Sequence, residues 1–447
     1  MNSSYLVGRD LRRYLAGAAA ARAGDEMSGP ALLLLGFAVT ERSGTGSGLL
    51  ASLTIAGAAG GPLFGALLDR SRRPDRLLAW TLAAYALGIV AVQAAVGQLP
   101  MPALAAIALL AGLFNPAVTG GWTAQLPRVV TERELDRGSA LDALTFSAAS
   151  LAGPALAAGI AAGIGARAAV LTAAALVALA VPAACSLSRY RPAAVAGEHR
   201  RPVTPGPMTP GLMTPDPVTL GRQIAAGFAV IVARRPLRRA TVTSVVSYAG
   251  IGMLLACCPV LGAERLGNPA RGALLISAMA VASLTANALL ARRPGPPCRR
   301  RPGCRRPDTW LLASTLVIGV SMTAAALAPG WLILAAVALG GAGEGPQLTA
   351  LLAVRHRETP AHLRGQVYTT AASLKIAGLA AGAALAGPLA GWSVTGCLLI
   401  AGGIELGAAA AYLMAGFTRP GRREPAVGAP PGRARTGAVA DRPVRSG

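Results

Sequence analysis

Long apolar blocks separated by short polar segments make up most of this chain. Each block is close to the length of about 20 apolar residues that a helix needs to cross the hydrocarbon core of a membrane. The blocks are continuous, whereas the strands of a membrane β-barrel alternate apolar and polar residues. The pattern therefore predicts an all-α polytopic membrane protein with twelve transmembrane helices, at residues 13–39, 45–68, 77–97, 101–124, 139–163, 166–187, 239–262, 271–291, 309–328, 330–353, 366–390 and 393–416.

Composition supports the same class. Only 14% of the residues are charged, whereas a soluble domain has about 25%, so the chain lacks the polar surface that a water-soluble globule needs. The net charge of +23 would suggest a nucleic-acid partner in a soluble protein. Here the arginines lie in the segments between apolar blocks, so membrane topology explains the charge and no nucleic-acid partner is expected.

The segments between the blocks alternate in charge along the chain. Those after the even-numbered spans are rich in arginine, such as DRSRRPDR (69–76), whereas those after the odd-numbered spans are short and nearly neutral, such as GQLPMP (97–102). Because arginine-rich loops stay on the cytoplasmic side, the alternation predicts a multi-pass plasma-membrane protein with both termini in the cytoplasm.

The chain also divides into two similar halves. The motifs GPALAAG (153–159) and GAALAGP (382–388) lie in the fifth and eleventh spans, and each span follows an Arg-Gly pair. Two six-span halves related in parallel are a known transporter plan. We therefore expect an N-terminal six-helix bundle (1–189), a cytoplasmic Pro/Thr/Gly/Arg-rich linker (190–235), a C-terminal six-helix bundle (236–417) and a disordered cytoplasmic tail (418–447).

The segment GALLDRSRRPDRLL (65–78) resembles the signature that the major facilitator superfamily carries between its second and third spans. The matching positions include Gly65, Asp69, Arg70 and Arg73, whereas Arg72 stands where the family usually has glycine. The resemblance implies the two-bundle fold with alternating access between the bundles, and it implies that the acid links the two halves at the cytoplasmic gate.

Physical reasoning gives Asp69 several possible partners. An acid is badly placed at the C-terminal end of its own helix, so positive charge from elsewhere is expected to answer it. The candidates are Arg70 or Arg73 close by, or the N-terminus of the helix that begins near Gly365. The alternative is an acid that only neutralises its arginine neighbours within a topological anchor.

The fifth span looks like that of the export-oriented branch of the superfamily, which carries a Gly-Pro antiporter motif there. Gly153 and Pro154 fit the motif, with Gly159 at its end, and Ala157 and Ala158 replace the usual glycine pair. The resemblance implies a secondary transporter for proton-coupled efflux of a small apolar drug, antibiotic or secondary metabolite. The alternatives are a nutrient importer or uniporter of the same fold, and a non-transporting membrane sensor.

Ionisable residues inside the predicted spans are costly, so each is a candidate for function. Arg22 and Asp25 lie three residues apart in the first span and are predicted to neutralise each other partly. Either the pair only fixes this helix against its neighbours, or a surplus acid takes up a proton, with Asp25 as the first candidate and Glu26 as the second. Burial favours the protonated form of a carboxyl group, so these acids are candidates for carrying a proton. In the second half, Glu344 and Lys375 are predicted to form an ion pair, either as a structural lock or as a protonation switch.

Other polar positions are fewer. Asn115 precedes Pro116 in the fourth span and would either line a cavity or only mark a kink. The three histidines fall in predicted cytoplasmic loops and are expected to be solvated: His199, His356 and His362.

The sequence has no catalytic triad, phosphate-binding glycine loop or metal-ligand cluster, so neither enzyme activity nor a cofactor is predicted. A proton gradient is then the expected driving force. The expected partners are a small-molecule substrate and membrane lipids, and the protein is expected to be a monomer.

Overall fold

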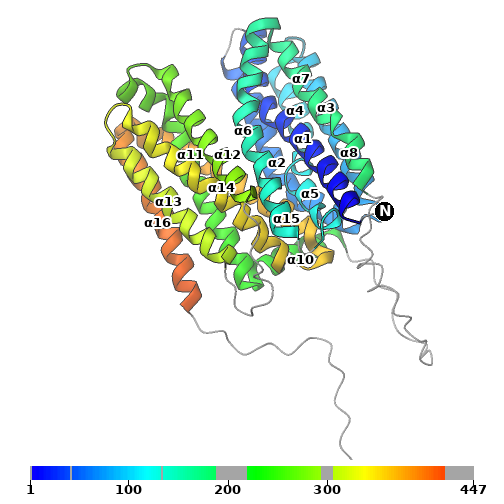
Figure 1. Cartoon of the computed structure of the whole chain (residues 1–447). Helices are drawn as coiled ribbons and strands as arrows, with labels where there is room; N and C mark the ends of the chain where they lie inside the picture. Colours follow the sequence, from blue (N-terminus) through cyan, green and yellow to red (C-terminus); the bar gives the residue numbers. More distant parts are fainter. Residues whose placement is uncertain (1–2, 41–42, 132–133, 188–218, 293–305, 418–447) are drawn as a thin grey trace, which may run out of the picture.

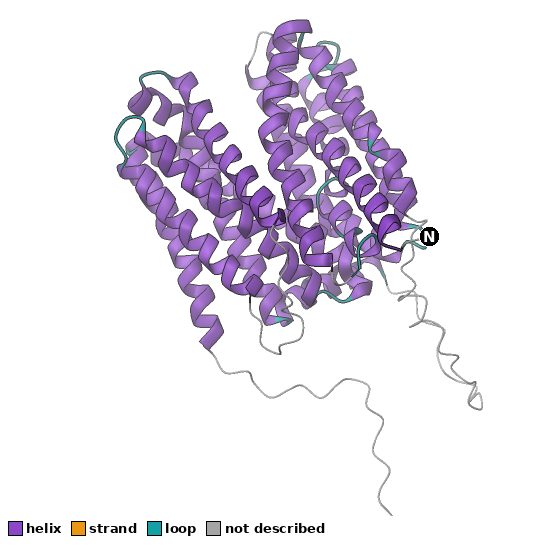
Figure 2. Ribbon diagram, viewed as in Figure 1, coloured by secondary structure: helices purple, strands orange, loops and turns teal. Residues whose placement is uncertain are grey.

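The computed structural model describes residues 3–40, 43–131, 134–187, 219–292 and 306–417. Within these ranges the chain is helical, without strands (Figure 2). Most of the predicted linker and the tail at 418–447 lie outside the described residues. The helices are α1 (Ser3–Thr40), α2 (Ser43–Arg70), α3 (Pro74–Ala95), α4 (Met101–Gly112), α5 (Gly120–Thr123), α6 (Leu135–Ile164), α7 (Ala166–Leu179), α8 (Val181–Ser186), α10 (Leu220–Ala233), α11 (Arg235–Leu266), α12 (Gly272–Arg292), α13 (Arg306–Leu327), α14 (Leu332–Glu358), α15 (Arg364–Trp392) and α16 (Val394–Phe417).

The helices form two bundles that stand side by side (Figure 1), an N-terminal half of α1 to α8 and a C-terminal half of α11 to α16. Among the described residues, 10 helical segments are long and apolar enough to cross a membrane. The two long helices outside that set, α1 and α14, carry the charged residues predicted for the first and tenth spans. The 10 segments together with α1 and α14 agree with the predicted twelve-helix fold.

The fourth span is broken rather than straight. Helix α4 ends at Gly112, a 3₁₀ turn follows at Asn115–Ala117, and α5 begins only at Gly120. Pro116 lacks a backbone N–H and so cannot continue the helical hydrogen bonding. The break turns Asn115 toward α1, which matters for the site described below.

Helix α10 was not predicted, because its 14 residues, most of them apolar, were assigned to the end of the linker. It packs against α2, α11 and α15. A Cβ atom at Gly227 would overlap the side chain of Gln366, so α10 lies directly against the start of α15. Ile231 is buried there with Leu237, Leu363 and Val367.

The two halves meet at one end of the molecule, where α2 ends and α15 begins. We call this the Asp69 end. Helix α10 lies at the same end, and α1 begins and α16 ends there (Figure 1). Leu352 of α14 and Tyr368 of α15 belong to the hydrophobic core of the N-terminal half, so the C-terminal half reaches into its partner at this point.

Candidate functional site

Asp69 joins the two halves by capping a helix. Its Oδ1 accepts a hydrogen bond from the backbone N–H of Gly365 at 2.7 Å, and its Oδ2 accepts one from Gln366 at 2.7 Å. The first N–H groups of a helix have no partner within that helix and attract negative charge. Of the partners considered from the sequence, the structure therefore places the N-terminus of α15 against Asp69, while the side chain of Arg73 is exposed. Arg70 is the last residue of α2.

Glycines at every fourth position of α2 continue this contact toward the membrane centre. The carbonyl oxygen of Gly61 accepts a hydrogen bond from Thr369 Oγ1 at 2.6 Å, and that of Gly57 accepts one from Ser373 Oγ at 3.0 Å. A Cβ atom at Gly65 would overlap Thr369 Oγ1. We call this line of contacts the α2–α15 seam. It extends along α2 from residue 69 to residue 57, about 18 Å at 1.5 Å per residue.

A second seam joins α6 to α12 with uncharged side chains. Asn287 Nδ2 donates to Ser147 Oγ at 2.9 Å, and Asn287 Oδ1 accepts from Thr349 Oγ1 of α14 at 3.0 Å. Ser147 and Ser283 also share a hydrogen bond of 3.1 Å. NALLAR (287–292) repeats GALLDR (65–70), so Asn287 occupies the position of Gly65, while alanine replaces the acid.

Asp25 is held by two donors from neighbouring elements. Its Oδ1 accepts hydrogen bonds from the hydroxyl of Tyr85 in α3 at 2.6 Å and from Nδ2 of Asn115 at 2.5 Å. Asn115 therefore has a specific partner beyond marking a kink. Its placement depends on the break between α4 and α5.

The predicted pairing of Arg22 with Asp25 is wrong. Arg22 forms an ion pair with Asp142 of α6 at 2.9 Å, and Thr123, Thr145 and the ring of Phe146 complete its surroundings. Arg22 is 1% exposed and Asp142 is fully buried. Asp142 accepts from both terminal nitrogens of the guanidinium and is fully buried, whereas Asp25 is engaged by Tyr85 and Asn115.

Asp142 was missed at the sequence level, although a signal for it exists. It is an ionisable residue inside the predicted span 139–163, and this same criterion selected Asp25 and Glu344. Tyr14 strengthens the group, because its hydroxyl donates to Asp142 Oδ1 at 2.8 Å.

Glu26 lies on the side of α1 that faces α6. Its Oε1 accepts a hydrogen bond from Ser150 Oγ at 3.1 Å. Gly153 is packed on Glu26, because an added Cβ atom would lie 2.5 Å from the Glu26 Cβ. Pro154 is exposed within α6, and no atom lies within 4 Å of a Cβ built at Gly159. Of the exporter-like motif, only Gly153 thus contacts the acid.

Glu344 and Lys375 do not form the predicted ion pair, because Tyr248 of α11 lies between them. The Tyr248 hydroxyl donates to Glu344 Oε1 at 3.1 Å. The Lys375 ammonium lies over the Tyr248 ring, 3.5 Å from its centroid. Tyr248 was also missed, since nothing local marks an aromatic residue in an apolar span.

The charged groups of the two halves lie close enough for their charges to interact. Glu26 interacts in this way with Glu344 and with Lys375. All three side chains are half-buried although each lies well inside its helix. We call Asp25, Glu26, Tyr248, Glu344 and Lys375 the central polar layer.

Two further groups near the Asp69 end are buried. His356 is 4% exposed and stacks on Tyr368 with ring centroids 4.9 Å apart, so the expectation that it is solvated is wrong. Arg355 beside it is 3% exposed. Both lie in the last turn of α14, which continues beyond the predicted end of the tenth span at residue 353.

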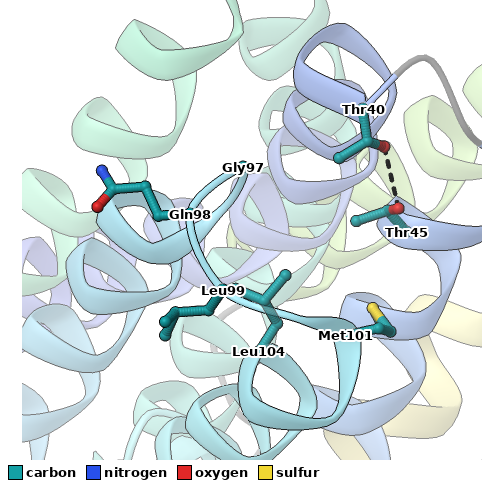
Figure 3. A pocket seen from close by; sticks show the side chains of 7 residues that line it. All are labelled: Thr40, Thr45, Gly97, Gln98, Leu99, Met101 and Leu104. Atoms are coloured by element: carbon teal, nitrogen blue, oxygen red, sulfur yellow. Dashed lines mark hydrogen bonds between the residues drawn. The ribbon is translucent and has the colours of Figure 1, made fainter.

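A pocket of about 380 Å³ lies where α1 ends and α2 begins, beside the loop between α3 and α4 (Figure 3). Its lining comes from the end of α1, the start of α2, the loop between α3 and α4, and α4: Thr40, Thr45, Gly97, Gln98, Leu99, Met101 and Leu104. None of the central polar layer lines this pocket.

Comparisons with known proteins agree with this fold. A protein described as "Uncharacterized MFS-type transporter y4rN", from Sinorhizobium fredii, is 27% identical over 363 residues, covering 79% of this chain and 81% of its own length.

Three solved structures share the fold at low sequence identity. The human organic anion transporter MFSD10 aligns with a TM-score of 0.69 and 16% identity, over 91% of this chain and 99% of its own. A bacterial homologue of the iron transporter ferroportin in an outward-facing state gives a TM-score of 0.67 and 14% identity over the same shares, 91% and 99%. The E. coli fucose:proton symporter FucP gives 0.66 and 12%, over 92% and 99%.

The sequence pattern of the Major Facilitator Superfamily matches residues 14–304, which is more than half of the chain. Together with the two helical bundles and the signature around Asp69, this match identifies the chain as a transporter of the Major Facilitator Superfamily.

Proposed function

We propose that this protein exports a small apolar molecule, such as a drug, an antibiotic or a secondary metabolite, in exchange for protons. The two seams hold the halves together at the Asp69 end. Transport then requires the halves to rock, so that the seams open and the opposite ends close around the same central site. On the topology expected from the arginine-rich loops, the Asp69 end faces the cytoplasm.

The observation that carries the proposal is the central polar layer. Carboxylates from both halves, Glu26 and Glu344, are half-buried at mid-helix and interact electrostatically across the two halves. Ionisable groups at that depth mark ion and substrate pathways in membrane proteins. Binding or loss of a proton there changes the interaction between the halves, which couples protons to rocking.

The direction of transport is supported by the exporter-like fifth span. Gly153 of that motif allows α6 to pack on Glu26, so the motif is adjacent to a candidate proton-binding acid. Asp25 lies beside Glu26 and accepts hydrogen bonds from Tyr85 and Asn115.

Asp25→Asn tests this proposal. An amide does not take up a proton, so we expect at least a ten-fold loss of gradient-driven efflux with normal membrane insertion. The measurement is accumulation of neutral apolar antibiotics, with chloramphenicol as the first probe, in cells that lack their own exporters, with and without a protonophore.

Asp10→Asn is the matched control, because Asp10 is on the same helix and pairs only loosely with Arg13 at 3.9 Å. It should leave efflux unchanged. Higher accumulation in expressing cells would instead favour an importer, and efflux that persists with the protonophore present would exclude proton coupling.

A further inference from the structure

Lys375 is the one lysine of the chain, and arginine occupies every other position among its 42 lysine and arginine residues. Arginine stays protonated in proteins, whereas lysine has a compact ammonium group that loses its proton when its surroundings favour the neutral form. This single lysine lies in the central polar layer.

The structure holds the Lys375 ammonium apart from the nearest carboxylate. Tyr248 presents its ring face to the ammonium and its hydroxyl to Glu344. Among the described residues, no carboxylate forms an ion pair with Lys375. A cation on an aromatic face is held less strongly than one bound to a carboxylate, so the ammonium is both positioned and able to lose a proton.

Close packing of the backbones fixes this arrangement. Cβ atoms at Gly378 and Gly382 of α15 would overlap the carbonyl oxygens of Val245 and Ala249 in α11. Tyr248 and Lys375 are therefore anchored on two helices that cannot separate without losing this contact.

The charged and titratable groups near Lys375 come from several elements. The fields of Glu344 and Arg355 from α14 and of Glu26 from α1 reach it, and Tyr248 of α11 contacts it. The acids on α2 and α16 make their contacts with other residues. Asp69 binds residues at the start of α15, and Glu405 packs against Gly250 of α11.

We propose that Lys375 carries a proton in the transport cycle and that Tyr248 positions it. When the pathway is open to one side, an N–H bond of the ammonium breaks, its electron pair remains on Nζ, and the proton passes to water. Glu26 and Glu344 then no longer interact with a positive charge on Lys375, which favours protonation of a carboxylate in the layer. This inference rests on the proposed function, because it assigns a group to proton coupling.

Lys375→Arg tests the inference, because it keeps the charge and removes the ability to lose it. The measurement is the ratio of accumulation driven by a pH gradient to exchange of chloramphenicol between the two sides of proteoliposomes, because exchange needs no net proton movement. This ratio should fall at least ten-fold. An unchanged ratio in Lys375→Arg would overturn the inference.

The unmodified protein separates the two proposals. If a pH gradient does not drive transport by it, the proposed function fails. If the gradient drives transport equally in both proteins, only the role of Lys375 fails.

A second measurement needs no substrate. Reductive methylation with ¹³C-formaldehyde labels only Lys375 and the N-terminal amine, so their NMR signals report each group separately. We expect the Lys375 methyl signal to shift with pH as the ammonium loses its proton, and a signal that stays constant over the whole pH range in which the protein remains folded would overturn the inference. Tyr248→Phe keeps the ring and should preserve this pH profile and part of the coupling. Tyr248→Leu removes the ring and should change both, and an unchanged profile in Tyr248→Leu would exclude positioning by Tyr248.

Discussion

Replacing Asp142 with alanine should destabilise the N-terminal half by about 3 to 5 kcal/mol, because Arg22 would remain buried without its counter-charge. Arg22 has Thr123 and Thr145 as its other side-chain hydrogen-bond partners, and neither is charged. Tyr14 would also lose the shorter of its two hydroxyl hydrogen bonds and keep only the one to the Trp122 carbonyl at 3.4 Å. The measurement is thermal unfolding of the purified protein in detergent, followed by tryptophan fluorescence, since Trp122 lies beside this group.

The double change Arg22→Met with Asp142→Leu provides the matching test. Replacing both members of a buried ion pair with apolar residues is often close to neutral, so the double variant should regain most of the lost stability. Asp10→Ala, which removes a half-buried acid on α1 that pairs only loosely with Arg13, should change the melting temperature little. If Asp142→Ala melts like the unmodified protein, the ion pair does not stabilise the fold.

Replacing Asp69 with asparagine should shift the protein toward conformations that are open at the Asp69 end. The carboxylate accepts two backbone hydrogen bonds from α15, whereas an amide has one acceptor oxygen. Hydrogen bonds to a charged group contribute about 1.5 to 3 kcal/mol each. A loss of about 2 kcal/mol changes the ratio of closed to open forms by roughly 30-fold.

The shift can be measured as a distance distribution between spin labels at positions 72 and 361, in a background without native cysteines. Arg72 and Ala361 are exposed on opposite sides of the seam. Glu134→Gln is the control. Glu134 is an exposed acid at the Asp69 end, just before α6, and its carboxylate accepts a hydrogen bond from nearby Thr131. An unchanged distribution in Asp69→Asn would favour the alternative in which Asp69 only neutralises neighbouring arginines.

The helical spans were predictable because they depend on local properties. Length and apolar content decide whether a segment crosses a membrane, so the twelve helices followed from the sequence. The contact of Asp69 with the start of α15 was also within reach, because an acid at a helix C-terminus needs positive charge and Gly365 marks a helix start.

Partners set by tertiary packing were not predictable in the same way. Arg22 has Asp25 three residues away, yet it binds Asp142, 120 residues along the chain, because α6 offers a buried bidentate acceptor. Glu344 and Lys375 are separated by Tyr248, a residue that no charge pattern indicates. Helix α10 follows a Pro-rich segment, and its buried face exists only because α2 and α15 lie beneath it.

The two seams differ in charge, and this difference gives the molecule a direction of opening. The α2–α15 seam is closed by a carboxylate, whereas the α6–α12 seam is closed by an amide and hydroxyl groups that do not titrate. Acidification at the Asp69 end would therefore weaken the α2–α15 seam and leave the hydrogen bonds of the α6–α12 seam unchanged. The α2–α15 seam would then open first, and the α6–α12 seam would follow as the halves rock apart at this end.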